Sequence, residues 1–441
     1  MDNKHILKKL DNGMKILLIP IKKIKLVDIQ LALNVGADNE THISKTNTDI
    51  ESSHFLEHMF STYTSKKYPD ARKVTSMLKQ YGITNNAMVD SNTSKYDLKL
   101  HKKHLKFILN LIYHTYSDFK VDTKIFKQEK VSIEEEIKNI LDDIWINLDE
   151  EIYKELYPNH IRGLSQKVNL ENVKKMKPND LIEFYKKFYI PRNTTLIIAG
   201  DFHIKETMNL CVSLFSKIKN NNHSNLTQGI SYVQQTPKVI FSKNTKTLSY
   251  NLYIIFRVPY TYFNKEYYSN YALSNILAND LESILLLELR SKHGLIYSLH
   301  YDVNLDENHK SLSNITINTQ LDEKNLLKTI KIILDILYDM SKKPISKKFY
   351  NKYKTDIEMS MLEDKAFKNS EEFINLYGRN VIFNKEIESS KDMFKKLSNV
   401  NTEEIMNEAG KIYKKNNMII GYSGRKNYDK QIEKLIDNCN L

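Results

Sequence analysis

The sequence predicts two similar α+β domains, each built from an antiparallel-rich β-sheet that is covered by helices. Three observations indicate this class. The chain has 441 residues, which is too many for one ordinary hydrophobic core and suits two domains of roughly 200 residues each. Hydrophobic residues make up 41% of it, which is enough to fill real cores. Segments with strand and helix periodicity also follow one another in the same order in both halves.

The first half alternates between strand and helix signals. Residues 26–36 place apolar side chains on every second position, which predicts a half-buried strand, and residues 93–100 alternate in the same way. Between them, residues 70–81 carry an apolar stripe with helical spacing, and Gly82 follows as a helix stop. A further amphipathic helix is predicted over residues 105–112.

The second half repeats this order. Residues 250–258 alternate as a strand, and a helical stretch follows them. Residues 294–304 and 311–320 are predicted to be strands, and residues 325–340 a helix. The ends of the halves correspond too, as FYKKFYIPRNTTLIIAGDF and KIYKKNNMIIGYSGRK. A duplicated α+β domain explains this repetition.

The boundary between the halves is predicted from composition. Residues 217–238 are polar and lack periodicity, so they are interpreted as a linker. The N-terminal domain then spans residues 1–216 and the C-terminal domain residues 239–441.

The charge and the cysteine count exclude several classes. The net charge is +12, but the basic residues are spread over both halves and no cluster with interleaved aromatics appears, so we expect no nucleic-acid partner. No run approaches 18 apolar residues, so we expect no membrane span. Two cysteines cannot form a disulfide framework. The N-terminus resembles neither a signal peptide nor a transit peptide, so we expect a cytoplasmic protein, or a virion-associated one if the source is viral.

The segment His54-Phe55-Leu56-Glu57-His58 points to metal chemistry. On a helix, positions i and i+4 share a face, so His54 and His58 can hold one metal ion through two imidazoles. Glu57 reaches the same face and can accept a proton from a water that the metal activates. The alternative is that the two histidines are ordinary capping or surface residues.

A catalytic zinc needs a third protein ligand. Residues 129–137 read EKVSIEEEI, and Glu129 and Glu136 are two helical turns apart, so both can face the same way. The alternative is a solvated acidic face, which is the usual meaning of a charge run and the favoured one on this pattern alone.

The sequence resembles the pitrilysin-type (M16) metallopeptidases, the group that includes the mitochondrial processing peptidase. The resemblance covers nearly the whole chain. The motifs that carry it are LDNGMKILLIP, VGADNE, SSHFLEHMF, ITNNAMVDSNTSKY, EKVSIEEEI and LRSKHGLIYSLHY.

The resemblance implies a zinc endopeptidase that hydrolyses short or unfolded peptides, with one Zn²⁺ per chain. Its implied ligands are His54, His58 and Glu136, with Glu57 as the general base and Glu129 as a supporting residue. The run Glu134-Glu135-Glu136 leaves the third ligand open by one residue. Glu136 is favoured by its spacing from Glu129.

The resemblance also implies how a peptide binds. The peptide adds as a strand at Asn86 and Ala87, and Arg290 holds a substrate carbonyl. Tyr297 acts as a catalytic residue that donates to the oxyanion. A strand, or a short turn followed by a strand, would present Arg290 and Tyr297 together. The family encloses substrate between four such domains, so we expect a homodimer or a pair with a homologous subunit.

Three departures from the family pattern concern details. Glu51-Ser52-Ser53 stands where Gly or Ala usually precedes HFLEH, Val89 replaces a Thr, and LANDLESILLLELR replaces a Gly-rich stretch. None removes a ligand or the base. The competing hypothesis is a catalytically idle structural subunit of the same fold.

Overall fold

The computed structural model describes residues 5–22, 25–42, 49–220, 227, 229–230, 234, 236–363 and 369–441. Residues 221–226, 228, 231–233 and 235 of the predicted linker lie outside the described residues. The chain forms two compact units, and neither is one continuous stretch. The first unit comprises Met1–Asn139, Gln166–Thr227 and Asp364–Lys391, and the second comprises Ile140–Ser165, Gln228–Glu363 and Asp392–Leu441.

The first unit is built on one β-sheet. Among the described residues it has six strands, β1 (Ile6–Lys9), β2 (Lys15–Pro20), β3 (Leu26–Leu33), β4 (Thr84–Val89), β5 (Ser94–His101) and β6 (Thr194–Gly200). Their order is β1-β2-β6-β3-β5-β4. Only β2 and β6 pair in parallel, and the other neighbours are antiparallel. Strand β4 therefore lies at a free edge of this sheet.

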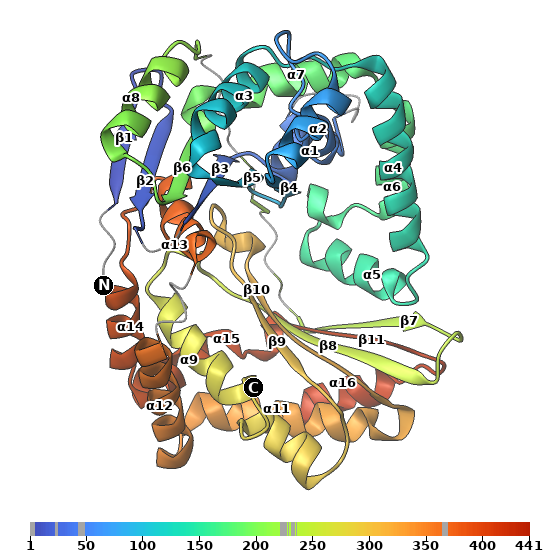
Figure 1. Cartoon of the computed structure of the whole chain (residues 1–441). Helices are drawn as coiled ribbons and strands as arrows, with labels where there is room; N and C mark the ends of the chain where they lie inside the picture. The colour runs from blue at the N-terminus through green and yellow to red at the C-terminus, as the bar shows by residue number, and fades with distance from the viewer. Residues whose placement is uncertain are drawn as a thin grey trace. The chain divides into compact units, whose positions relative to one another are not determined.

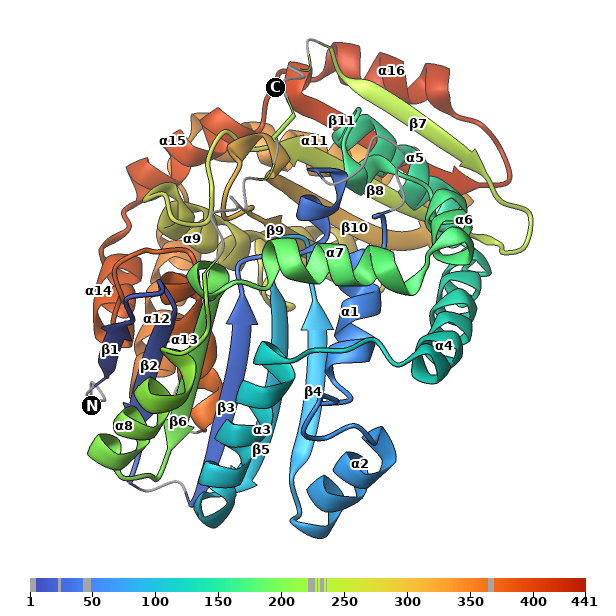
Figure 2. The same ribbon diagram turned by 90° about the horizontal axis from the view of Figure 1, so that it is seen from above.

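Helices cover both faces of the first sheet. The helices that belong wholly or mostly to the first unit are α1 (Ser52–Phe60), α2 (Ala71–Gln80), α3 (Leu105–Ser117), α4 (Thr123–Leu141), α6 (Gln166–Lys175), α7 (Pro178–Phe188), α8 (Ile204–Phe215) and α13 (Ser370–Ile382). Phe60 of α1 packs on Tyr96 of β5 with ring centroids 4.5 Å apart, which places α1 on one face. On the opposite face the Ser370 hydroxyl donates to Asp28 of β3, which places α13 there. Figure 2 shows α1 beside the edge strand β4.

The second unit is built on a smaller sheet. Its described strands are β7 (Lys238–Lys243), β8 (Ser249–Arg257), β9 (His300–Asn304), β10 (Asn314–Asp322) and β11 (Met418–Gly424). Their order is β7-β11-β8-β10-β9. Only β7 and β11 pair in parallel, and the other neighbours are antiparallel.

The two sheets share one topology. Strands β2, β6, β3, β5 and β4 correspond in order and direction to β7, β11, β8, β10 and β9. The predicted duplication of an α+β domain with an antiparallel-rich sheet is therefore confirmed. Strand β1 has no counterpart among the described residues of the second sheet.

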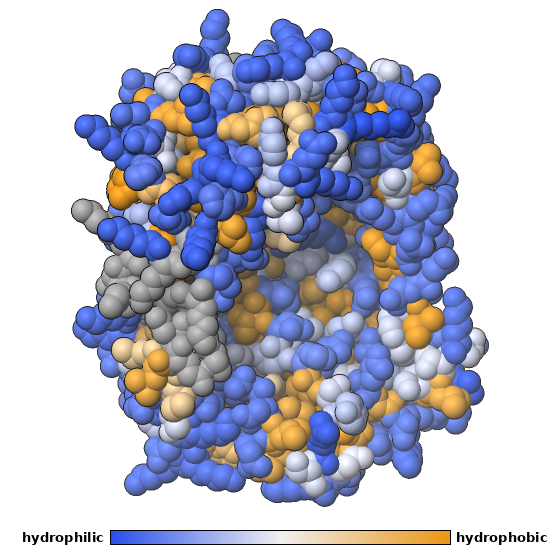
Figure 3. All heavy atoms as spheres, in the orientation of Figure 1, coloured by the Kyte–Doolittle hydropathy of each residue, from blue (hydrophilic) through white to orange (hydrophobic). Residues whose placement is uncertain are grey.

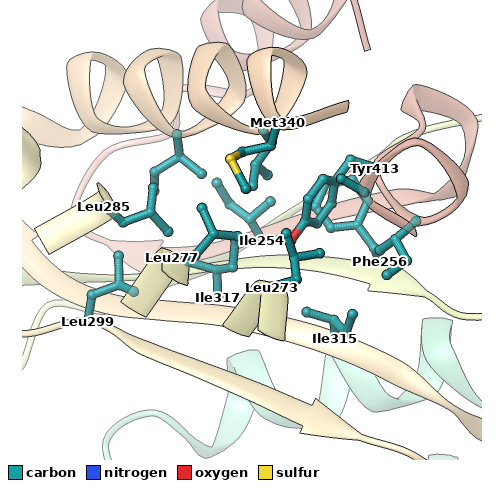
Figure 4. Close-up of a cluster of buried hydrophobic side chains, with 14 of the residues drawn as sticks. Ile254, Phe256, Leu273, Leu277, Leu285, Leu299, Ile315, Ile317, Met340 and Tyr413 are labelled. Carbon is teal, nitrogen blue, oxygen red and sulfur yellow. The ribbon is translucent and has the colours of Figure 1, made fainter. Parts of the chain in front are cut away.

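A layer of apolar side chains lies between the second sheet and its helices. These helices are α9 (Glu266–Ala278), α10 (Ile284–Leu286), η5 (Leu287–Lys292), α11 (Leu326–Lys342), α12 (Lys347–Glu363), α14 (Ser390–Asn399), α15 (Thr402–Ile412) and α16 (Asp429–Asn438). Figure 4 shows Ile254 and Ile317 of the sheet meeting Leu273, Leu277 and Met340 of the helices. The alternation of apolar residues in β8 and β10 is what points these side chains to one face.

Each unit takes one helix from the half of the chain that mainly builds the other unit. Helix α5 (Ile146–Leu156), from the first half of the chain, packs on the second sheet, where Leu148 and Ile152 meet Ile255 and Ile419. Helix α13, from the second half, packs on the first sheet (Figure 1). At Gly378 of α13 an added Cβ would lie 2.6 Å from Cδ1 of Ile197 of β6, so a larger residue there would force that side chain to move.

Most predicted elements are present, with one correction. The segment 294–304 is a strand only from His300, because Ile296 makes a single bridge to Leu321 and the residues around it are looped. The molecular face in Figure 3 is mostly hydrophilic. Within the described ranges, none of the helices combines the length and the apolar character that crossing a bilayer requires.

Candidate metal centre

Helix α1 carries the His-x-x-Glu-His segment and is anchored by its apolar face. Phe55, Leu56, Met59 and Phe60 are buried. The ring of Phe55 stacks on Phe126 of α4, with centroids 4.7 Å apart and the planes 10° apart. This contact fixes α1 against α4 and leaves the polar face of α1, with its two histidines, turned toward α4.

Helix α4 supplies the acidic side of the site. Phe126, Ile133 and Ile137 are buried at helical spacing, so α4 is firmly packed. Glu129 and Glu136, two turns apart, both reach the histidines of α1. Glu135 points elsewhere, because its carboxylate pairs with Lys138 at 2.6 Å.

Three candidate ligand atoms converge between the two helices. Glu136 Oε2 lies 3.3 Å from His54 Nε2 and 3.8 Å from His58 Nε2. One atom from each of these three residues lies within 4.8 Å of the others. In the described part of the chain, no other set of three or more His, Cys, Asp or Glu residues meets this condition. The structure thus brings together the three residues that the sequence nominated.

The three residues fit a zinc ion. Two imidazole nitrogens and one carboxylate form a His₂Glu donor set typical of catalytic zinc sites, which keep a fourth position open. Ligands at about 2.0–2.1 Å from a tetrahedral ion lie about 3.3 Å apart, which the separation between Glu136 and His54 matches, while all three pairs lie within 4.8 Å. Half of the Glu136 side chain is exposed, so the site is open to solvent.

Each imidazole also has a carboxylate on its other nitrogen. His58 Nδ1 lies 2.9 Å from Glu129 Oε2, and His54 Nδ1 lies 2.8 Å from Glu51 Oε2. In the tautomer whose Nδ1–H donates to the carboxylate, the Nε2 lone pair is left for a metal. Glu129 therefore stands where a supporting residue belongs.

The carboxylates around His54 stabilise its protonated form. Burial alone would lower the pKa of His54, but the hydrogen bond and charge of Glu51, with the charges of Glu57 and Glu136, raise this pKa to about 9. In the metal-free protein this imidazole therefore holds a proton that a metal ion has to displace.

Glu57 lies beside the candidate ligands without being one of them. Burial raises the pKa of its carboxyl, and the charges of His54 and His58 and a hydrogen bond from the Val89 backbone N–H oppose the rise. Val89 belongs to the edge strand β4, so this bond joins the candidate base to that edge.

Asn86 and Ala87 lie on β4, opposite Asp97 and Tyr96 of β5. The Asp90 N–H donates to Thr93 across the turn that joins these two strands. Backbone groups alternate along an antiparallel strand, so the N–H and C=O of Ala87 and Val89 point to the open edge. The Val89 N–H is already bonded to Glu57, so the N–H and C=O of Ala87 and the C=O of Val89 are the backbone groups available next to the candidate metal centre.

Arg290 and Tyr297 belong to the second unit. Arg290 lies on the π-helical turn η5, and Tyr297 lies in the loop before β9, so neither is presented by the strand that the sequence suggested. The guanidinium carbon of Arg290 lies 4.6 Å from the centre of the Tyr297 ring. Tyr297 is 78% exposed, so it is not part of a hydrophobic core.

Sequence reasoning did not give roles to Glu40 and Glu51. Glu40 is almost fully buried and accepts the backbone N–H groups of Glu51 and Ser53 at 2.8 and 2.9 Å. A signal was present for Glu51, because it departs from the small residues that usually precede HFLEH.

A His-x-x-Glu-His helix facing a glutamate on a neighbouring helix, in a duplicated α+β fold, defines a metallopeptidase-like architecture. The family profile "Insulinase (Peptidase family M16)" matches residues 22–164, and the profile "Peptidase M16 inactive domain" matches residues 175–356. The chain belongs to the M16 peptidase family.

Individual relatives agree with this assignment. The chain is 23% identical over 412 residues to the uncharacterized zinc protease YmxG of Bacillus subtilis, covering 91% of this chain and 94% of that protein. It is 24% identical over 353 residues to the insulin-degrading enzyme of Mus musculus, covering 76% of this chain. It spans about a third of the length of that enzyme.

The fold also matches solved structures. A protease from Helicobacter pylori superimposes with a TM-score of 0.83 at 18% identity, over 96% of this chain and 99% of that one. Pitrilysin matches with a TM-score of 0.77 at 18% identity, over 97% of this chain and 45% of its own. The likeness to the mitochondrial processing peptidase in particular stays a prediction.

Proposed function

We propose that this chain is a zinc-dependent endopeptidase that hydrolyses short or unfolded peptides, with one Zn²⁺ per chain. The observation that carries the proposal is the convergence of His54, His58 and Glu136, with Glu57 beside them. Several relatives are named zinc proteases, which supports the choice of metal.

His54, His58 and Glu136 would hold the zinc ion. A zinc ion in such a site supplies Lewis-acid chemistry, polarising a carbonyl and lowering the pKa of water. The chain's own base is Glu57, which takes the proton of the attacking water and passes it to the leaving amine. The Val89 N–H holds its carboxylate in place, and burial raises its pKa toward the range that suits a general base at neutral pH.

The substrate would add as a strand to the free edge of β4. The outward backbone groups of Ala87 would pair with the peptide, and such pairing tolerates many sequences. The bond between Val89 and Glu57 ties this edge to the base, so a peptide paired there would run past the metal ligands.

Arg290 and Tyr297 would act on the same peptide from the second unit. Arg290 would hold a substrate carbonyl, and Tyr297 would donate to the developing oxyanion. Their stacked side chains, with an exposed Tyr297, support a role in binding more than a role in packing. The active form would be a homodimer or a pair with a homologous subunit, as in our expectation from the sequence.

A catalytically idle subunit of the same fold is the second candidate. It is favoured by the description of the profile over residues 175–356, which names an inactive domain. That profile does not cover the His-x-x-Glu-His segment, which lies within the match to the other M16 profile at residues 22–164. The two candidates make different predictions for the chemistry of Glu57.

The proposal is tested by comparing the wild-type chain with Glu57→Gln. Both should bind one zinc per chain, because Glu57 is not a ligand. The variant should lose hydrolysis of a mixed peptide library by several orders of magnitude, because an amide cannot accept the proton. Zinc is measured by elemental analysis and cleavage by mass spectrometry. A wild-type chain that binds zinc and cleaves nothing in the library, alone or with a homologous subunit, would favour the idle subunit.

A further inference from the structure

Glu51 adopts a backbone conformation that its residue type disfavours. Its φ is 72° and its ψ is 8°, in the left-handed region, where glycine is the residue without a steric penalty. It occupies the position before α1, yet its side chain makes no capping hydrogen bond to that helix. Capping, the usual reason for an acidic residue at the start of a helix, therefore does not explain why position 51 is a glutamate.

Glu40 does the capping in its place. The Glu40 carboxylate accepts the backbone N–H groups of Glu51 and Ser53 at 2.8 and 2.9 Å, and also the Ser53 hydroxyl. These bonds hold the backbone of Glu51 in its left-handed conformation. They also place a second carboxylate next to Glu40, and burial, followed by the charge of Glu51, raises the pKa of Glu40 to about 8. For stability alone, a neutral residue would serve better at position 51.

The side chain of Glu51 contacts one of the candidate metal ligands. Its Oε2 lies 2.8 Å from His54 Nδ1, and only 15% of the side chain is exposed. His54 Nε2, on the other side of the ring, is the atom that faces Glu136. On α4, Glu129 makes the same kind of contact with His58. Each histidine thus has a carboxylate at its Nδ1. For His54 it comes from Glu51, three positions earlier in the chain, and for His58 from Glu129 on another helix.

We propose that Glu51 is a positioning residue for the metal centre, which fixes the tautomer and the ring orientation of His54. Its carboxylate accepts the Nδ1–H, so that the Nε2 lone pair faces the metal position, and its charge makes Nε2 a stronger donor. This inference rests on the proposed zinc site. The left-handed backbone of Glu51 is held by the two N–H bonds to Glu40 on one side and by the contact of its side chain with His54 on the other.

The test compares Glu51→Gln and Glu51→Gly with the wild-type chain in two measurements. Zinc affinity is measured by competition with a chromophoric chelator, and the Tm is measured on metal-free protein. Glu51→Gly should weaken zinc binding about 10- to 100-fold, the usual effect of losing such a partner. Glu51→Gln keeps an acceptor without the charge and should lie between. The metal-free Tm of Glu51→Gly should change little, because glycine relieves the strain and the repulsion from Glu40, whereas the ion pair with protonated His54 is lost.

A third readout separates positioning from general stability. Cobalt(II) bound in place of zinc reports ligand geometry in its visible spectrum, and this spectrum should change in Glu51→Gly but not in the matched control Glu135→Gln. Unchanged zinc affinity and an unchanged cobalt spectrum, with a lowered Tm in Glu51→Gly, would show that Glu51 acts on stability alone and overturn the inference. If the wild-type chain itself binds no zinc, the proposed function fails first, and that result is distinct.

Discussion

Three carboxylates lie around the ring of His54 in the candidate site. Glu51, Glu57 and Glu136 all act on it and raise its pKa to about 9. The same negative charge that holds a proton in the metal-free protein would hold a divalent cation in its place. Proton and metal therefore compete for this residue, and assays of metal binding need a fixed and stated pH.

The third ligand is tested on α4. Glu136→Gln should lower zinc occupancy, because its carboxylate is the one that approaches both histidines. Glu134→Gln should leave occupancy unchanged, because Glu134 is two residues away and points about 200° around the helix. Elemental analysis of both variants measures this. If Glu135→Gln alone strips the zinc, the assignment is wrong by one residue.

At the scale of elements, a pocket adjoins the edge strand on the face that α1 does not cover. Its volume is about 280 Å³, and it is lined by strands β3, β4 and β5 and by α13. Three carboxylates, Asp28, Asp97 and Glu371, line it with one ammonium, Lys99. Lys99 approaches Asp28 and Glu371 at 3.6 and 3.9 Å, whereas Asp97 accepts a hydrogen bond from the neutral Gln30.

This pocket predicts a preference among substrates. A peptide paired with β4 would turn every second side chain to this face, and Asp97, whose pKa is raised chiefly by burial, would gain from a cation. In the wild type, a peptide with Lys at such a position should be cleaved faster than its Gln analogue. In Asp97→Asn this ratio of kcat/KM should fall several-fold. An equal ratio in both proteins would contradict the prediction, while cleavage itself would still stand.

Local periodicity predicted the elements well but not their partners. Strands β3, β5, β8 and β10 and helices α2, α3 and α11 all lie where alternation or helical spacing placed them. An amphipathic pattern shows that a helix has a buried face without showing which sheet buries it. The packing of α5 and α13 on the sheets of the opposite halves therefore could not be predicted from their sequences.

Short-range patterns in the sequence also predicted most of the candidate site. His54, Glu57 and His58 share one short motif, and the two-turn spacing of Glu129 and Glu136 is readable in the sequence. Glu40 lies 11 residues before Glu51, and its role depends on a fold of the chain that no short-range pattern reports. Tyr297 was expected on a strand because its segment alternates, but the partner strand β10 pairs only from His300 onward.

At the scale of the whole molecule, Lys15 holds helix α13 in place. Its ammonium donates to the carbonyls of Val381 and Ile382 at the end of α13, and to Asn384 Oδ1 at 2.9 Å. Burial, together with the charge of Lys9, lowers its pKa to about 8. The unfolded chain then holds a proton between about pH 8 and pH 10.5 that the folded chain has lost, so this group makes stability rise with pH in that window.

The variant Lys15→Met removes this titration and keeps the aliphatic stem. The Tm of the wild type minus that of the variant should therefore grow between pH 7.5 and pH 9.5, measured on metal-free protein. The buried tyrosines titrate in both proteins and cancel in the difference. Parallel curves of Tm against pH would show that Lys15 keeps an ordinary pKa in the folded chain.

The position of α13 in the chain also determines when the first sheet can be completed during biosynthesis. The first sheet lacks one cover until α13 has been made, and α13 ends at Ile382, late in the chain. When the candidate metal ligands have been synthesised, the face of the first sheet that α13 later covers, including Ile197 of β6, is therefore still bare. A fragment that stops at residue 216 would stay in that state and expose apolar surface to aggregation or to chaperones. Completion of the first unit, which carries the candidate metal ligands, therefore waits for synthesis of nearly the whole chain.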